Sequence, residues 1–269
     1  MTRRPASLTF WQRWRSHIVR APFFAVVTGG LGTLALVASL WAKTGRTQHR
    51  IARVWARACV FISGARLTVR GGENLRRLPV AVYAANHTSY MDTPVVFSSL
   101  PFQFRILAKK ELWSLPFIGW YLSRSGQIPI ETGNPRAALA SLSAGVKALR
   151  AGMSLFVFPE GSRTPDGELK TFLAGAAYLA IRAQVPVVPI ALSGVYDLLP
   201  IHTRHFYPCD MTLTAGEPIV TTGMTPRQTD ELTERLRGAI AKMLGTRELE
   251  CGECGAGALG SAGPHAGKV

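Results

Sequence analysis

The chain has 269 residues, enough for one globular domain of ordinary size with additional segments. It is 47% hydrophobic and carries 31 Lys and Arg residues against 16 Asp and Glu residues, a formal net charge of +15. So basic a chain requires a negatively charged neighbour. Because the sequence is rich in apolar residues and contains no recognised nucleic-acid motif, we expect an anionic membrane surface and no nucleic acid as that neighbour.

The cysteines do not form the pattern of a disulfide framework. There are four of them, Cys59, Cys209, Cys251 and Cys254, scattered between apolar, loop and tail sequence. A reducing compartment is the simpler interpretation.

The N-terminal part contains an apolar stretch, residues 21–42, without a single charge. A bilayer core requires roughly 20 such residues, so the stretch is long enough to cross a membrane. A cleaved signal peptide is the alternative, but the run exceeds the usual length of a signal core and no small-x-small site closes it cleanly. Gly29, Gly30 and Gly32 weaken a helix in mid-segment, and basic residues flank both ends, so no orientation follows. The sequence therefore predicts a span, a hairpin or a half-inserted helix.

Residues 47–64 repeat apolar and basic residues at near-helical spacing. The apolar positions are Ile51, Val54, Trp55, Ala58 and Phe61, and the basic positions are Arg50, Arg53 and Arg57. Such a helix either lies among lipid headgroups or packs on a soluble core with a solvated basic face. Four of the six tryptophans lie in these first segments, as is typical of a membrane interface. We interpret residues 1–62 as a membrane-associated helical segment.

Strand and helix patterns alternate through residues 63–246, which we interpret as the catalytic domain. Strands are expected at residues 67–69, 80–85, 104–107, 128–130, 154–158 and 185–192, and helices at residues 94–100, 116–123, 135–151, 175–183 and 226–244. Asn134 as N-cap with Pro135 at the first helical position marks one helix start. This alternation predicts an α/β fold with a mostly parallel sheet flanked by helices.

Residues 247–269 are rich in Gly and Ala and are predicted to be a disordered tail, because such sequence cannot bury enough surface to order itself. Cys251 and Cys254 could hold zinc or cycle between redox states, but one such pair lacks the other ligands of a zinc site. No metal site is expected.

Residues 86–92 (Asn-His-Thr-Ser-Tyr-Met-Asp) follow the apolar run 80–85 directly. Open α/β sheets carry their chemistry at the carboxyl ends of the strands.

His87 and Asp92 are five residues apart, and on an early helical turn their side chains could meet. A carboxylate on one imidazole nitrogen fixes the tautomer and leaves the other nitrogen free to take a proton. We interpret the pair as a general-base dyad. The alternative is an ordinary polar histidine with satisfied hydrogen bonds.

Two further segments carry residues suited to a phosphorylated polyol. Lys109 lies at the end of the strand expected at residues 104–107, where a basic side chain can hold a phosphate. In residues 158–164 (Phe-Pro-Glu-Gly-Ser-Arg-Thr), Gly161 exposes backbone N–H groups, Arg163 can clamp a phosphate, and Glu160 can accept hydrogen bonds from a polyol. Taken singly, each segment also fits a solvated surface or an ordinary turn.

In their order along the chain, these segments resemble the motifs of the glycerolipid acyltransferases, the 1-acylglycerol-3-phosphate acyltransferase family. The His-x-x-x-x-Asp pattern resembles the first motif, residues 158–164 the third, and residues 185–190 the fourth. The second motif usually closes with Ile-Asp-Arg, whereas this chain has Glu131 and Thr132 after the isoleucine. A lysine that frequently follows Phe172 is replaced by Leu173. The lost arginine puts the expected phosphate contact of the acceptor in doubt.

The resemblance, which covers about residues 67–197, implies transfer of a fatty acyl group to the sn-2 hydroxyl of lysophosphatidic acid in phospholipid biosynthesis. The donor would be acyl-CoA or acyl carrier protein, with no further cofactor and no covalent acyl-enzyme. His87 would be the base oriented by Asp92, while Lys109, Glu160, Gly161 and Arg163 would bind the lysophospholipid acceptor.

The expected location is the membrane, at the cytoplasmic face of the bacterial inner membrane. Two alternatives stay open. The loss of arginine at Thr132 allows a different acceptor, such as a lyso-aminolipid, and the same fold could serve a non-catalytic lipid-binding membrane protein.

Overall fold

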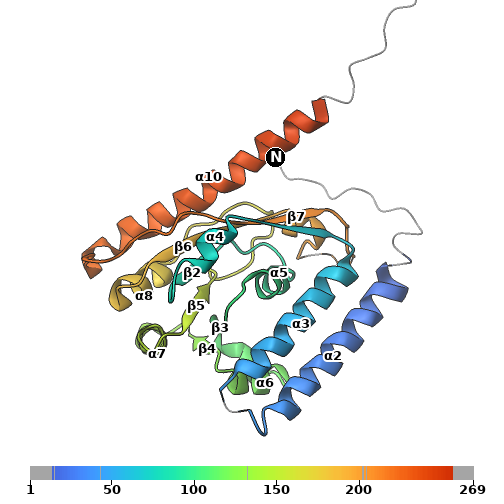
Figure 1. Cartoon of the computed structure of the whole chain (residues 1–269), viewed down its shortest axis with the longest axis horizontal. Helices are drawn as coiled ribbons and strands as arrows, with labels where there is room; N and C mark the ends of the chain where they lie inside the picture. The colour runs from blue at the N-terminus through green and yellow to red at the C-terminus, as the bar shows by residue number, and fades with distance from the viewer. Residues whose placement is uncertain are drawn as a thin grey trace, which may run out of the picture.

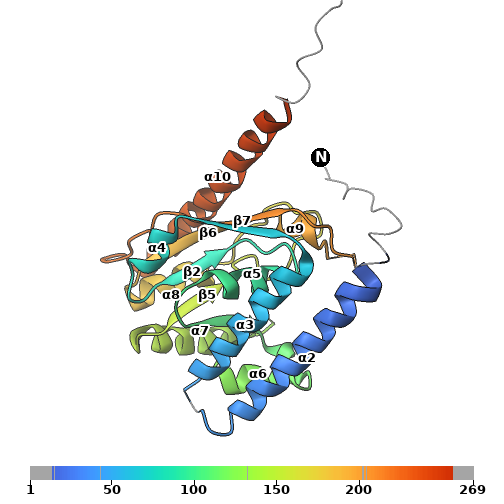
Figure 2. The ribbon, with the colours of Figure 1, turned by 45° about the vertical axis from the view of Figure 1, so that its right-hand side comes forward.

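The computed structural model describes residues 14, 16–42, 44–131, 133–201, 203 and 205–256 (Figures 1 and 2). Its centre is a seven-stranded sheet in the order β1-β7-β6-β2-β5-β3-β4. The strands are β1 (Arg66–Arg70), β2 (Val82–Ala85), β3 (Phe104–Lys109), β4 (Ile128–Ile130), β5 (Ser154–Val157), β6 (Val187–Ser193) and β7 (Asp210–Ala215). Every neighbouring pair runs parallel except β6 and β7, which run antiparallel. The predicted α/β fold with a mostly parallel sheet is confirmed.

Helices cover both faces of this sheet (Figure 1). They are η1 (Ser16–Arg20), α2 (Ala21–Ala38), α3 (Arg46–Ser63), α4 (Gly72–Arg76), α5 (Asp92–Ser99), η2 (Lys110–Ser114), α6 (Ile118–Ser125), α7 (Pro135–Arg150), α8 (Gly175–Ala183), α9 (Val195–Leu198), η3 (Pro226–Gln228) and α10 (Thr229–Ala256). Helix α7 begins as predicted, because the side chain of Asn134 accepts hydrogen bonds from the N–H groups of Arg136 and Ala137.

Two apolar cores hold the layers together. Beneath α3 and α5 the core contains Tyr83, Phe104 and Phe156, and beneath α7, α8 and α10 it contains residues such as Leu155 and Leu179. Every residue of β2 and of β5 is buried. Strands covered on both faces need apolar side chains in both directions, which explains their continuous apolar sequence.

The sequence did not predict β7, which lies between β1 and β6. Its residues alternate between apolar and polar types, with Met211, Leu213 and Ala215 buried. The strands of a parallel sheet are predicted from continuous apolar runs, and an alternating antiparallel strand does not have that pattern. As a consequence β1 lies at the edge of the sheet, three places from β2.

The last helix is longer than predicted, since α10 continues to Ala256 instead of ending at residue 244. Residues 257–269 and the side chains of Cys251 and Cys254 lie outside what the structure describes. The division of the chain at residues 62 and 246 therefore stays a prediction.

Helices α2 and α3 form a hairpin on the outer side of α5 (Figures 1 and 2). The indole N–H of Trp55 donates to the hydroxyl of Thr28 over 3.0 Å and joins the two helices. The segment Ile18–Ala38 is long and apolar enough to cross a membrane, and only 6% of its most apolar window is buried. By composition and length this is weak evidence for membrane association, and it fits a span as well as half-insertion.

Helix α3 buries only part of the apolar face that its spacing predicted. Ala52, Ala56 and Cys59 lie in the core and Trp55 packs against it, whereas Val54 and Phe61 are 54% and 83% exposed. The helix therefore packs on the core of the domain, as one interpretation of residues 47–64 expected, and its contact with lipid headgroups stays a prediction.

Candidate active site

The site begins where β2 ends, at a buried asparagine that fixes the strand to its neighbour. The side-chain amide of Asn86 donates to the carbonyl of Leu192 over 3.0 Å, and its oxygen accepts the N–H of the same residue over 2.7 Å. These two side-chain hydrogen bonds continue the pairing of β2 with β6 one step beyond the last pair of backbone-bonded residues, Ala85 and Ile190. The loop carrying His87 therefore leaves the sheet from a fixed point.

The side chains of His87 and Asp92 meet, with 2.7 Å between Nδ1 and Oδ2. Asp92 is the first residue of α5 and has no exposed surface. Its Oδ2 atom also accepts the backbone N–H groups of Thr88 and Ser89, over 2.6 and 2.8 Å. The prediction placed the pair on one helical turn, but His87 precedes the helix and the intervening loop wraps around the carboxylate.

These contacts determine the tautomer of His87. An oxygen that already accepts two backbone N–H groups is an acceptor toward the ring as well, so Nδ1 carries the proton. The neutral ring then has its lone pair on Nε2, the nitrogen that a proton acceptor needs.

The His87 ring is also fixed by stacking on Phe158. The two ring centroids are 4.0 Å apart and the planes differ by 15°, while 14% of the histidine side chain is exposed. Phe158 in turn packs edge-on against Phe156 in the core. The sequence did not single out Phe158, whose only indication was its position directly after β5.

Glu160 joins the dyad loop to the loops that follow β5. It is 6% exposed, and its Oε1 accepts the N–H of His87 over 2.8 Å, while its Oε2 accepts the N–H of Lys170 over 3.4 Å. The N–H of Thr164 donates to the carbonyl of His87 over 3.0 Å. Both carboxylate oxygens are thus directed at backbone groups, whereas the resemblance implied contact with a polyol.

Gly161 allows the turn that brings these loops together. Its φ of +69° is in the left-handed region, and a Cβ at this position would lie 2.9 Å from a methyl group of Leu173. Glycine adopts this conformation without strain. The turn closes with the N–H of Gly161 donating to the carbonyl of Phe158 over 3.1 Å.

The two expected phosphate ligands occupy different places. The guanidinium carbon of Arg163 lies 4.0 Å from the centroid of the Tyr90 ring, beside the dyad loop. Lys109 ends β3, two strands away from β2 at the same edge of the sheet, and is exposed. The neighbouring Lys110 forms an ion pair with Glu131 at 2.7 Å. Thr132, the departure from the family pattern, lies outside the described residues.

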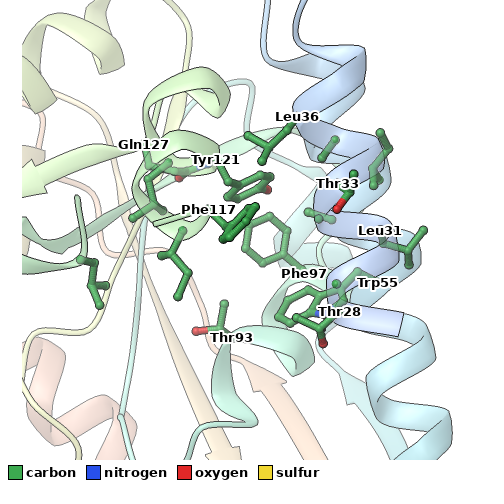
Figure 3. Close-up of a pocket in the computed structure, with 18 of the residues that line it drawn as sticks. Thr28, Leu31, Thr33, Leu36, Trp55, Thr93, Phe97, Phe117, Tyr121 and Gln127 are labelled. Atoms are coloured by element: carbon green, nitrogen blue, oxygen red, sulfur yellow. Dashed lines mark hydrogen bonds between the residues drawn. The ribbon is translucent and has the colours of Figure 1, made fainter. Parts of the chain in front are cut away.

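An apolar cavity of about 650 Å³ lies between the α2–α3 hairpin and the sheet (Figure 3). Its walls come from α2, α3, α5, β3, η2 and α6, and Phe97, Phe117 and Tyr121 project toward one another inside it. Thr93, which follows Asp92, is part of the lining, so the cavity extends to the helix that carries the dyad carboxylate. The sequence did not predict the cavity, because its walls come from segments far apart along the chain.

His49 is a core histidine. It packs between Phe97 and Phe104, its Nε2 lies 3.1 Å from the carbonyl of Phe102, and burial lowers its pKa to about 4. Within the described part of the chain no group of three or more His, Cys, Asp or Glu side chains could hold a metal ion.

Comparison with known proteins identifies the class. The family model described as "Acyltransferase" matches residues 66–193, which include the dyad, the Glu160 loop and β6. The structure superposes on the crystal structure of the 1-acyl-sn-glycerophosphate acyltransferase PlsC from Thermotoga maritima with a TM-score of 0.73, at 24% identity, over 89% of this chain and 98% of that one. The α/β domain is thus that of an acyltransferase.

The curated relatives narrow this to one family. The chain is 31% identical to the 1-acyl-sn-glycerol-3-phosphate acyltransferase of Pseudomonas aeruginosa, over 74% of this chain and 79% of the relative. It is 32% identical to the chloroplastic LPAT1 of Arabidopsis thaliana over 69% of this chain, and it spans about half the length of the two chloroplastic relatives it matches (54% and 44%). The chain belongs to the 1-acyl-sn-glycerol-3-phosphate acyltransferase family, as its motifs predicted.

The buried carboxyl group of Glu160 should make the free energy of unfolding depend on pH. Burial raises the pKa of its carboxyl from 4.5 to about 7, an effect that the N–H groups of His87 and Lys170 oppose and the charge of Asp92 reinforces. The folded protein therefore binds a proton that the unfolded chain has lost. Stability from this group is complete below about pH 4.5 and is lost as the pH rises through about 7.

Thermal unfolding over a pH series measures this effect. Between about pH 4.5 and 7 the wild type should lose stability relative to Glu160→Gln, because the amide does not titrate. Glu168→Gln, an exposed change nearby in the chain, is the control and should follow the wild type. Parallel pH profiles for the wild type and Glu160→Gln would contradict the assignment.

Proposed function

We propose that the protein transfers a fatty acyl group from acyl-CoA or acyl carrier protein to the sn-2 hydroxyl of lysophosphatidic acid, giving phosphatidic acid in phospholipid biosynthesis. The observation that carries this proposal is the His87–Asp92 pair, whose geometry leaves Nε2 as a free proton acceptor at the carboxyl edge of the sheet. Family membership and the names of the relatives support the choice of acceptor.

In the proposed reaction, Nε2 of His87 takes the proton of the acceptor hydroxyl while the oxygen attacks the thioester carbonyl. A C–O bond forms, the tetrahedral intermediate collapses with loss of the C–S bond, and the thiolate receives the proton from the imidazolium. Asp92 holds the ring and stabilises its charged form. No acyl-enzyme and no cofactor beyond the acyl donor is needed. General-base help contributes typically ~10²–10⁴-fold, so positioning of the two substrates supplies the remainder.

The acceptor's phosphate is assigned to the loop that carries Arg163. A guanidinium binds phosphate oxygens in pairs, and its stacking on Tyr90 limits the orientations it samples. Gly161 gives the loop its sharp turn, and Lys109 adds positive charge from two strands away. Glu160 acts in this proposal by holding the backbone of His87 and Lys170 together.

The apolar cavity is proposed to hold an acyl chain. Its volume of about 650 Å³ falls within the ~300–1,000 Å³ range of small-molecule sites, and Thr93, the residue that follows Asp92 in the chain, is part of its lining. One wall is α2, the helix long and apolar enough to enter a membrane. The formal charge of +15 favours the anionic cytoplasmic leaflet, so we place the protein at the cytoplasmic face of its membrane.

Replacement of the base tests the mechanism. His87→Ala should lower the rate of acyl transfer by ~10²-fold or more, because no other group takes the hydroxyl proton. Circular dichroism and the thermal transition should show a folded protein, since the two backbone N–H groups still bind Asp92. Full activity of this variant would exclude His87 as the base.

A panel of acceptors tests the substrate. With purified wild-type protein and acyl-CoA, lysophosphatidic acid should give the highest kcat/KM, because Arg163 complements a phosphate. A higher value with a lyso-aminolipid would support the alternative suggested by Thr132. Absence of thioester turnover with every acceptor and donor would support the non-catalytic lipid-binding protein.

Narrowing of the cavity tests its occupant. Gly32 lines the cavity and has no atom within 4 Å of an added Cβ, so Gly32→Leu should fill space without a clash. We expect the ratio of kcat/KM for long-chain over medium-chain donors or acceptors to fall by roughly ten-fold. Gly30→Leu, on the same helix but outside the cavity lining, is the matched control and should keep the wild-type ratio. Equal ratios in both variants would remove the acyl chain from this cavity.

A further inference from the structure

The phosphate of the proposed acceptor needs more positive charge than Arg163 supplies. A phosphate monoester carries about −1.5 to −2 at neutral pH. The family pattern described above has an arginine and a lysine at two further positions. In this chain those positions are occupied by the uncharged residues Thr132 and Leu173. Lys109 ends a strand two places from β2, so a second cation close to Arg163 has to come from elsewhere.

Lys170 is such a cation. It lies in residues 167–176, which resemble the family pattern, but the sequence did not single it out as a ligand. Its Nζ lies 2.6 Å from the hydroxyl of Ser162, the residue directly before Arg163. An ammonium has three N–H donors, and this contact uses one of them. Among the described residues no carboxylate forms an ion pair with Lys170 within 4.0 Å. Two donors are therefore available on the loop that carries Arg163, although the charges of Glu160 and Asp166 also act on this lysine.

The backbone of Lys170 is held from both sides. Its N–H donates to Glu160, which also binds the N–H of His87, so one carboxylate links Lys170 to the backbone of the proposed base. Its carbonyl accepts a hydrogen bond from Nε of Arg237 on α10 over 3.1 Å, and the carbonyl of Leu169 accepts one from the same guanidinium over 3.4 Å. A flexible side chain on an anchored backbone loses less freedom on binding than one on a mobile loop.

We propose that Lys170 binds the phosphate monoester of the acceptor together with Arg163, as the cation that compensates for Thr132 and Leu173. Arg163 provides the planar two-point contact and Lys170 the compact point charge. This inference rests on the proposed function. CoA also carries a phosphate monoester, so the shared chemistry is a phosphate dianion, and the experiment separates its two sources.

The test compares kinetic constants of the wild type and four variants with lysophosphatidic acid, with acyl-CoA and with a monoacylglycerol, an acceptor without phosphate. Lys170→Met removes the charge at similar length, and Lys170→Arg retains it. Ser162→Ala removes the hydroxyl that contacts Nζ but keeps the charge. Lys147→Met removes one charge from the exposed face of α7 and is the matched control.

In Lys170→Met the KM for lysophosphatidic acid should rise roughly ten-fold or more, while kcat, the KM for acyl-CoA and the constants for monoacylglycerol stay near wild type. Lys170→Arg should recover most of the loss. Ser162→Ala and Lys147→Met should keep the acceptor KM within about three-fold, because the charge at residue 170 is retained.

Three results would overturn the proposal. A rise confined to the KM for acyl-CoA would assign Lys170 to the donor. If Lys170→Met lost as much kcat/KM with monoacylglycerol as with lysophosphatidic acid, the lysine would only support the structure of the loop. The same conclusion would follow if Ser162→Ala raised the KM for lysophosphatidic acid as much as Lys170→Met does. An unchanged acceptor KM in Lys170→Met would remove it from the site.

Equilibrium binding of lysophosphatidic acid without a donor provides a readout independent of turnover. Lys170→Met should bind it more weakly than the wild type and Lys147→Met, and equal affinities would count against the proposal. A wild type that binds lysophosphatidic acid but transfers no acyl group would refute the proposed function while leaving the binding role of Lys170 intact.

Discussion

The buried carboxylate of Asp92 is the contact on which the rest of the site depends. A carboxylate without exposed surface is costly unless its oxygens accept enough hydrogen bonds. Here a single oxygen collects the His87 ring and the N–H groups of Thr88 and Ser89, and this requirement bends the chain between β2 and α5 around it. The same contacts decide which imidazole nitrogen carries the proton. Local folding and the chemical competence of His87 therefore have one cause.

The loops around this carboxylate are joined by polar bonds between distant segments. Asn86 connects β2 to β6, and Glu160 connects the backbone of His87 to that of Lys170. Arg237 extends the connection to α10, which packs with α8 on the sheet. A fixed geometry at the sheet edge is obtained in this way without regular secondary structure, which suits the proposed binding of two large substrates.

The sequence predicted the features that depend on local pattern. Apolar runs marked the buried strands, Asn134 marked a helix start, and the ordered motifs indicated the family and the pairing of His87 with Asp92. The features that the sequence did not show depend on contacts over long distances in the chain. The alternating pattern of β7 can also occur in a loop. The direction of the Glu160 oxygens depends on the N–H groups of His87 and Lys170, which the fold brings to either side of that carboxylate.

The sequence could not show the cavity for the same reason, since its walls come from six elements, α2, α3, α5, β3, η2 and α6. The sequence did not single out Lys170, and only its contact with Ser162 shows the direction of its side chain. Patterns within one segment predict that segment, whereas a site is formed by side chains that several segments bring together.

The exposure of α2 has a consequence for how the molecule responds to its surroundings. This helix forms one wall of the cavity, and the opposite side of the same helix, including Val26 and Phe23, is open to the medium. Whatever covers the outer side of α2 therefore borders a wall of the internal space. In the proposal that this space holds an acyl chain, the solvent, detergent or lipid around α2 would bear on the chain length that the protein prefers.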